Sequence, residues 1–360
     1  MTPAATHQWR GVIEEYRKLL PVSRNTPVVT LGEGGTPLVE SGWLSKLTKC
    51  TVWLKVEANN PTGSFKDRGM TMAVSHAVEV GAKAVVCAST GNTSASMAAY
   101  ASRGQLKSLV LVPHARIAHG KLAQAVVHEA RIVHVRGGFD DCLQLARSVA
   151  KDHPVELVNS VNPMRLEGQK TAAFELVDFL GEAPDIHVLP VGNAGNIASY
   201  WKGFCQYVET GRAVKTPALW GFQAAGAAPL VSGRIVTLPD TVASAIRIGN
   251  PASWVLAEAA RDASGGVIEA VTDRQILAAQ RDLAALDGVF VEPASAAGVA
   301  GLVVRHQAGL VDAGQTITVT VTGHGLKDVE TAMDFRGESP DCVIDADVDA
   351  VVSAAGLCDG

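Results

Sequence analysis

The sequence predicts an α/β protein of two lobes, each a mostly parallel β-sheet flanked by helices. Short apolar runs alternate with helical patterns from residue 83 onward, and these runs lack the polar alternation of a half-exposed strand. The composition agrees with this class. Hydrophobic residues make up 47% and charged residues 19% of the chain, which is typical of a packed enzyme and not of a disordered or fibrous protein.

The first of the two lobes is expected at residues 70–157. The predicted strands are 83–89, 108–113, 131–135 and 156–159, and the predicted helices are 94–102, 120–130 and 139–152. Because apolar strands joined by helical crossovers form parallel sheets covered on both faces, this segment makes one small lobe.

The same alternation resumes after residue 158. We predict helices at 166–180 and 197–211, with strands at 186–192, 218–224 and 316–323. A further strand, 51–57, precedes the small lobe. Residues 1–69 are therefore expected to join residues 158–345 in one discontinuous large domain, and residues 346–360 are expected to form a C-terminal tail with a short helix.

Charge and cysteine usage exclude several function classes. The formal net charge of -5 gives no general attraction to nucleic acids or anionic membranes. Six cysteines and ten histidines are scattered without zinc-ligand spacing, so no metal site is expected. No basic segment followed by an apolar run opens the chain, and we expect a cytoplasmic protein.

The segment NPTGSFKDRGM, residues 60–70, places Lys66 between an apolar strand and an apolar helix. The positive end of a helix dipole, together with Arg68, favours the neutral form of the amine, which is the form that a Schiff base requires. An exposed surface lysine in front of a helix is an equally good interpretation of this segment alone.

Three further loops carry candidate binding groups. ASTGNT, residues 88–93, suits an anion such as a carboxylate, although N-capping by Ser89, Thr90 or Thr93 would also explain it. GNAGN, residues 192–196, can turn backbone amides toward a phosphate or can simply be a tight turn. In TVTGHGLKD, residues 320–328, Thr322 either presents a hydroxyl to a ring or merely ends a strand.

Seven segments taken together, in order along the chain, resemble the threonine synthase family. They are NPTGSFKDRG, ASTGNT, NSVNPMRLEGQKT, VGNAGNI, AIRIGNPASW, GVFVEPASAA and TVTGHGLKD. The resemblance extends from GEGGTPL at residues 32–38 to about residue 331. It implies a fold type II pyridoxal-phosphate enzyme with the tryptophan-synthase β fold, and the order of the segments is more specific than any one of them.

The resemblance also implies roles for individual residues. Lys66 would form the Schiff base with pyridoxal 5'-phosphate, Asn92 would contact the ring hydroxyl, and Thr322 would face the pyridine nitrogen. The cofactor phosphate would lie on Gly192, Asn193, Ala194, Gly195 and Asn196. The substrate α-carboxylate would contact Ser89, Thr90 and Thr93. A second phosphate would be bound by Arg165, Asn159 and Ser160, with Asn193 in reach of the same group.

The activity implied is that of a lyase in threonine biosynthesis. O-phospho-L-homoserine and water would give L-threonine and inorganic phosphate by γ-elimination followed by β-addition of water, in a homodimer. Two alternatives remain: a dehydratase or cysteine-synthase-like enzyme of the same fold, and a catalytically silent cofactor-binding protein. Because only about 30 residues precede GEGGTPL, we expect no regulatory domain for S-adenosylmethionine. The two-lobed layout also predicts closure of the small lobe over the substrate.

Overall fold

The computed structural model describes residues 7–114, 122–334 and 343–357. The chain divides into two compact units, residues 1–328 and 329–360. The second unit contains α14 (Val329–Met333) and α15 (Val348–Ala354), and the latter lies within the predicted C-terminal tail. No helix in the described ranges is long and apolar enough to span a membrane.

The larger sheet of the first unit has six strands in the order β1-β2-β10-β7-β8-β9. All neighbouring pairs are parallel except β1 and β2, which are antiparallel. The strands are β1 (Leu38–Glu40), β2 (Thr51–Val56), β7 (Ile186–Pro190), β8 (Ala218–Ala224), β9 (Val267–Val271) and β10 (Thr316–Val321). The sequence predicted four of these six strands, and β1 and β9 were missed.

The smaller sheet has four parallel strands in the order β5-β4-β3-β6. They are β3 (Ala84–Ala88), β4 (Lys107–Pro113), β5 (Arg131–Val135) and β6 (Val155–Leu157). Every strand of this sheet comes from the segment predicted as the small lobe. The two-sheet, mostly parallel α/β class is therefore confirmed, whereas the domain boundaries stay a prediction.

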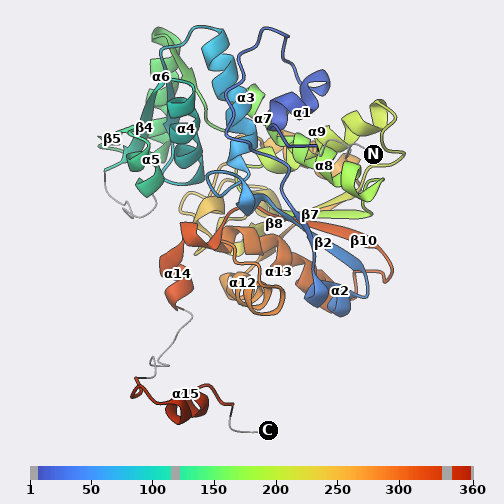
Figure 1. Cartoon of the computed structure of the whole chain (residues 1–360). Helices are drawn as coiled ribbons and strands as arrows, with labels where there is room; N and C mark the ends of the chain where they lie inside the picture. The colour runs from blue at the N-terminus through green and yellow to red at the C-terminus, as the bar shows by residue number, and fades with distance from the viewer. Residues whose placement is uncertain (1–6, 115–121, 335–342, 358–360) are drawn as a thin grey trace, which may run out of the picture. The chain divides into compact units, whose positions relative to one another are not determined.

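Helices cover both faces of the larger sheet (Figure 1). On one face α12 (Asp273–Asp287) and α13 (Pro293–Gln307) share a core with Val188, and on the other face α8 (Thr171–Leu180) and α9 (Gly195–Glu209) share a core with Leu189. Adjacent residues of β7 thus enter opposite cores, which explains why an uninterrupted apolar run is a strand here. The remaining helices of this part are α1 (Val12–Tyr16), α2 (Gly42–Thr48), α10 (Pro229–Ser232) and α11 (Trp254–Ala263).

The smaller sheet is covered in the same way. Val85 and Cys87 of β3 pack with α3 (Lys66–Glu79), α4 (Asn92–Arg103) and α5 (Ala123–Val127) on one face, whereas Val86 and Ala88 pack with α6 (Phe139–Asp152) on the other. The predicted helix at 120–130 is thus shorter than expected, and its first residues lie outside the described ranges.

The single helix predicted at 166–180 is wrong. The structure has two helices, α7 (Pro163–Gln169) and α8, separated at Lys170. The hydroxyl of Thr171 donates to the carbonyl of Gly168 at 2.6 Å, and the amide of Gln169 donates to the carbonyl of Arg165 at 2.9 Å. Side chains that bind helix carbonyls in this way bend or interrupt a helix.

A buried ion network fixes the start of α3. The guanidinium of Arg68 is fully buried and donates to Glu57 at 2.7 and 2.8 Å and to Glu175 at 2.5 and 2.7 Å. Lys55 donates to Oε2 of Glu175 at 2.5 Å, an oxygen that also accepts from Arg68. Burial raises the pKa of Glu175, but Arg68 and Lys55 outweigh this effect and lower that pKa to about 2. The network ties α3 to the 3-10 turn after β2 (Glu57–Asn59) and to α8.

Loss of Arg68 should destabilise the protein strongly. Arg68→Ala leaves two buried carboxylates without their main partner, so the free energy of unfolding should fall by about 3–5 kcal/mol. Urea denaturation measures this change. The control is Arg281→Ala, because the Arg281–Asp282 pair is exposed and its loss should cost less than about 1 kcal/mol. Equal losses for the two variants would contradict the importance of the network.

Candidate active site

Lys66 is the first residue of α3 and lies against the end of β10. The backbone amide of Phe65 donates to the carbonyl of Thr322 at 2.9 Å, and Ser64 forms an isolated bridge with Gly323. Strands β2 and β10 are parallel neighbours, so the turn that follows β2 and the loop that follows β10 leave the sheet at the same edge. The structure therefore brings Lys66 and Thr322 together.

The environment of Lys66 favours its neutral amine. Burial lowers the pKa of Lys66, the charge of Arg165 lowers it further, and Glu292 opposes these effects, with a resulting pKa of about 7. The direction agrees with the sequence-based expectation, but the cause differs. Arg68 was expected to act on Lys66, but it instead forms ion pairs with Glu57 and Glu175. The ammonium group lies 4.4 Å from the centre of the Phe65 ring.

Asn92 is the first residue of α4 and is held by a carboxylate that the sequence analysis missed. Its Nδ2 donates to Oε1 of Glu292 at 2.9 Å, and Glu292 is 5% exposed. Because an ionised carboxylate only accepts hydrogen bonds, the amide nitrogen must face it. The other N–H and the oxygen of Asn92 are then oriented away from Glu292.

The side chains of Ser89, Thr90 and Thr93 do not cap the N-terminus of α4, as the capping interpretation would require. The N-cap residue of α4 is Gly91, and no side chain caps this helix. Ser89 instead accepts from the amide of Gly91 at 3.2 Å. Ser89 and Thr90 are partly exposed, whereas Thr93 is buried in the first turn of the helix. The hydroxyls of this turn are thus not used as helix caps.

Asn159 connects the end of the edge strand β6 with the end of its neighbour β3 in the smaller sheet. Its side-chain amide accepts from the backbone N–H of Ala88 and donates to the carbonyl of the same residue, both at 3.0 Å. Ser160 follows it and is partly buried. The carboxyl ends of β3 and β6, which carry the 88–93 turn and the 159–165 segment, are therefore held side by side.

Arg165 is not the solvated helix residue that the sequence alone would allow. Its side chain is fully buried in α7, and Nη1 donates to the carbonyl of Val158 at 3.2 Å. Its Nε and Nη2 have no hydrogen-bond partner in the part of the chain that the structure describes. Burial lowers the pKa of Arg165 to about 10, although Cys87 and Asp67 act in the opposite direction. Buried guanidinium N–H groups of this kind are suited to a bound anion.

The 192–196 loop is a tight connection between β7 and α9. A Cβ atom at Gly192 would lie 2.9 Å from Cα of Ile246, so only glycine fits there. Ala194 adopts a left-handed conformation with φ of 64° and is buried in the core beside α9. Asn193 accepts from the backbone amide of Ala252 at 2.6 Å. Nδ2 of Asn196 is buried and has no partner among the described residues.

These features fit a phosphate group. The first amides of α9 have no partner within the helix, and the positive end of the helix dipole points toward the loop. Because β7 is the parallel neighbour of β10, the loop lies at the same edge of the sheet as Thr322. The structure thus places the 192–196 turn, a lysine of lowered pKa and a buried arginine near the ends of parallel strands.

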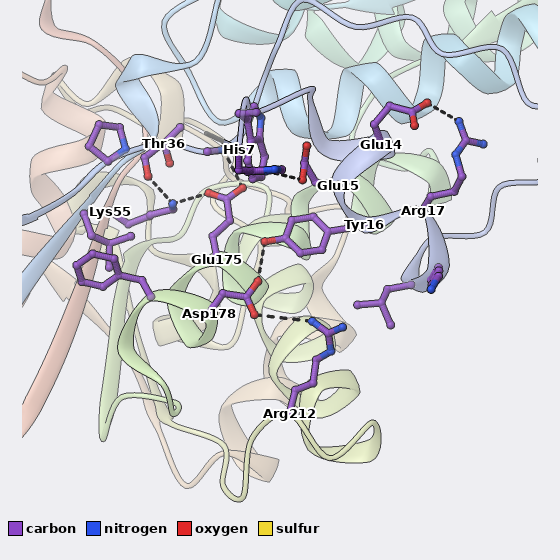
Figure 2. Close-up of a pocket in the computed structure, with 17 residues that line it drawn as sticks. His7, Glu14, Glu15, Tyr16, Arg17, Thr36, Lys55, Glu175, Asp178 and Arg212 are labelled. Carbon is purple, nitrogen blue, oxygen red and sulfur yellow. Dashed lines mark hydrogen bonds and ion pairs between the residues drawn. The ribbon is translucent and has the colours of Figure 1, made fainter. Parts of the chain in front are cut away.

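A cavity of about 1000 Å³ lies elsewhere, between the N-terminal segment, the loop before β1 and α8 (Figure 2). None of the predicted site residues lines it. Its polar side chains are largely paired with one another: Lys55 with Glu175, Tyr16 with Asp178 and Arg17 with Glu14. This pairing makes the cavity part of the structural network and not the candidate active site. No group of three or more His, Cys, Asp or Glu in the described ranges could hold a metal ion.

Comparison with known proteins identifies the family. The family model described as pyridoxal-phosphate dependent enzyme matches residues 29–323. A threonine synthase of Mycobacterium tuberculosis is 58% identical over 99% of both chains. A threonine synthase of a Synechocystis strain is 54% identical over 97% of this chain and 92% of its own length.

Solved structures agree at the level of the fold. Maize serine racemase covers 85% of this chain and 94% of its own, with a TM-score of 0.70 and 21% identity. Fold, site geometry and sequence similarity therefore agree that this chain belongs to the pyridoxal-phosphate dependent enzymes and, within them, to the threonine synthase family.

Proposed function

We propose that this protein converts O-phospho-L-homoserine and water into L-threonine and inorganic phosphate, as the last step of threonine biosynthesis. The observation that carries the substrate assignment is the fully buried guanidinium of Arg165, whose Nε and Nη2 have no acceptor among the described residues and whose charge acts on Lys66. A phosphate bound there would satisfy those groups beside the reacting amine.

The residues present fit pyridoxal 5'-phosphate. Lys66 would hold it covalently, the 192–196 loop would bind its phosphate, Asn92 would contact its ring hydroxyl, and Thr322 would face its ring nitrogen. The unpartnered amide of Asn196 and the lowered pKa of Lys66 support this assignment. When bound, the cofactor withdraws electrons from the amino-acid substrate and makes its Cα proton acidic.

Two groups of residues would hold the ends of the substrate. The hydroxyls of Ser89, Thr90 and Thr93 precede or open α4, where the helix dipole favours the α-carboxylate. Arg165, with Asn159 and Ser160, would bind the phosphate at the other end. The paired contacts of Asn159 with Ala88 support this arrangement, because they hold the two groups at a fixed separation.

Lys66 would move the protons. With a pKa of about 7, roughly half of its amine is unprotonated at neutral pH, and this form can accept the Cα proton and later return it. Loss of a Cβ proton would supply the electrons that expel the γ-phosphate, and Arg165 would hold that phosphate as the Cγ–O bond breaks. Cγ would then take up a proton, and water would supply the hydroxyl at Cβ while its other proton goes to the released phosphate. Return of the Cα proton by Lys66 gives L-threonine, which is released together with the phosphate.

Assembly, location and domain division belong to the same proposal. We propose a cytoplasmic homodimer whose large domain comprises 1–69 and 158–345, with a small domain at 70–157 that closes over the substrate. Cys50, Cys87 and Cys142 are free and buried, which supports a reducing compartment. Sedimentation of the pure protein as a monomer would contradict the homodimer.

Turnover provides the primary test. Wild-type protein reconstituted with pyridoxal phosphate should release threonine and inorganic phosphate from O-phospho-L-homoserine in equal amounts. Lys66→Ala should abolish both, because the amine that moves the Cα proton is lost. A coloured wild-type protein that releases neither product would instead favour a dehydratase or a silent cofactor-binding protein.

Replacement of Arg165 should impair the use of phosphorylated substrate. A hydrogen bond to a charged group contributes about 1.5–3 kcal/mol, so Arg165→Met should lower kcat/KM for O-phospho-L-homoserine by about 10- to 100-fold. Inorganic phosphate should inhibit the wild type competitively and the variant much less. Arg281→Ala, on the exposed face of α12, is the matched control and should leave both values unchanged. Equal kinetics for all three proteins would remove Arg165 from the site.

The lowered pKa of Lys66 can be measured without cofactor. In the apoprotein, competitive labelling by acetic anhydride follows the unprotonated amine, so labelling of Lys66 should have its midpoint at about pH 7. Arg165→Met removes a nearby positive charge and should move this midpoint upward, since the ammonium form becomes less unfavourable. A wild-type midpoint near the ordinary lysine value of about 10.4 would contradict the assigned environment.

A further inference from the structure

The hydroxyl of Thr322 is paired with a serine to which the sequence analysis gave no role, although it lies within the segment GVFVEPASAA. Ser295, the third residue of α13, is fully buried, and its Oγ lies 2.8 Å from Oγ1 of Thr322. Ser295 Oγ also accepts from two backbone amides, those of Thr322 at 3.0 Å and Gly323 at 2.8 Å. Thr322 itself is 4% exposed.

The number of donors around Ser295 determines the direction of the hydrogen bond between the two hydroxyls. A serine hydroxyl has one proton and two lone pairs. Both lone pairs are used by the two backbone N–H groups, which can only donate. Thr322 therefore cannot donate to Ser295. The proton of Ser295 goes either to Oγ1 of Thr322 at 2.8 Å or to the carbonyl of Gly323 at 3.2 Å, and the shorter contact is the one to Thr322.

The two amides are themselves fixed in place. A Cβ atom at Gly323 would lie 2.4 Å from Oε1 of Glu292, so this turn has no room for another residue. The carbonyl of Gly323 accepts from the backbone amide of Glu292 at 3.0 Å, and the carbonyl of Thr322 accepts from that of Phe65. The backbone N–H groups of Thr322 and Gly323 therefore stay directed at Ser295 Oγ, and the orientation of the Ser295 hydroxyl is fixed as well.

The hydroxyl proton of Thr322 therefore remains available for donation to a bound group. Among the residues that the structure describes, no acceptor lies within hydrogen-bond distance of this hydroxyl, since its one contact is Ser295. A buried hydroxyl in this state is suited to an acceptor atom that carries no proton of its own.

We infer that Ser295 is a positioning residue that orients the hydroxyl of Thr322 as a hydrogen-bond donor toward the ring nitrogen of the bound cofactor, which favours the unprotonated form of that nitrogen. This inference rests on the proposed function, in which Thr322 faces the pyridine nitrogen. A protonated nitrogen could donate only to the remaining lone pair of Thr322, which would leave the proton of this buried hydroxyl without an acceptor, so the protonated form is disfavoured. The cofactor ring then stays neutral and accepts less negative charge from the substrate than a pyridinium would.

The test is ¹⁵N NMR of the holoprotein reconstituted with pyridoxal phosphate labelled at the ring nitrogen. The wild type should give the signal of an unprotonated, hydrogen-bonded nitrogen that does not titrate across the stability range. Thr322→Val should shift this signal to that of a nitrogen without a hydrogen bond, and the dissociation constant of the cofactor should rise about tenfold. Thr322→Ser keeps the hydroxyl and should give the wild-type signal.

Ser295→Ala tests the positioning role itself. Without Ser295, the hydroxyl of Thr322 can rotate, so the ring nitrogen should become able to take up a proton and its signal should change with pH. Ser295→Thr restores the hydroxyl and should restore the wild-type signal. If Ser295→Ala does not fold, the Thr322→Val and Thr322→Ser pair still determines which way the hydroxyl donates.

Two results would overturn the inference. The first is a protonated ring nitrogen in the wild type, and the second is an identical signal in the wild type, Thr322→Val and Ser295→Ala. These results are separate from failure of the proposed function. A holoprotein that releases no phosphate from O-phospho-L-homoserine fails the functional proposal whatever its ¹⁵N signal, whereas an active enzyme with a protonated ring fails only this inference.

Discussion

The geometry of the site depends on the ion pairs that the buried guanidinium of Arg68 forms. It binds Glu57 just after β2 and Glu175 on α8, and both carboxylates are almost completely removed from solvent. A buried ion network of this kind adds little net stability compared with apolar packing, but it tolerates only one arrangement of its members. Lys66 lies two residues earlier on the same helix, so the network also fixes the backbone from which its side chain extends.

The two sheets contribute different parts of the site. Strands β2, β7 and β10 end side by side, and the loops after them carry Lys66, the 192–196 turn and Thr322. Strands β3 and β6 also end side by side, and their loops carry the 88–93 turn and Arg165. The groups assigned to the cofactor come mainly from the larger sheet, and those assigned to the substrate come from the smaller one. Under the proposed closure, the smaller sheet would move with the substrate while the cofactor stays on the larger sheet.

The sequence was informative wherever function depends on a local pattern. Lys66, the 88–93 turn and the 192–196 loop each follow an apolar strand, and parallel strands bring such loops to one edge. Long-range pairs left no comparable pattern. Glu292 contacts Asn92, which lies 200 residues away in the sequence. Ser295 lies in an alanine-rich helix, where a small side chain is expected to serve only in helix packing. The interruption of the predicted 166–180 helix was missed because Thr171 and Gln169 have ordinary helix-compatible identities, and only their hydrogen bonds to carbonyls reveal it.

Ala194 has a consequence for the thermodynamics of cofactor binding. A non-glycine residue in the left-handed region, here at φ of 64°, costs roughly 1–2 kcal/mol, and glycine at this position would remove that strain. The methyl group of Ala194 is instead buried in the core, which immobilises the backbone of the loop before any phosphate arrives. A loop of consecutive glycines would have to lose its conformational entropy on binding, whereas this loop has already lost it on folding. The strain at one residue thus shifts an entropic cost from the binding equilibrium to the folding equilibrium.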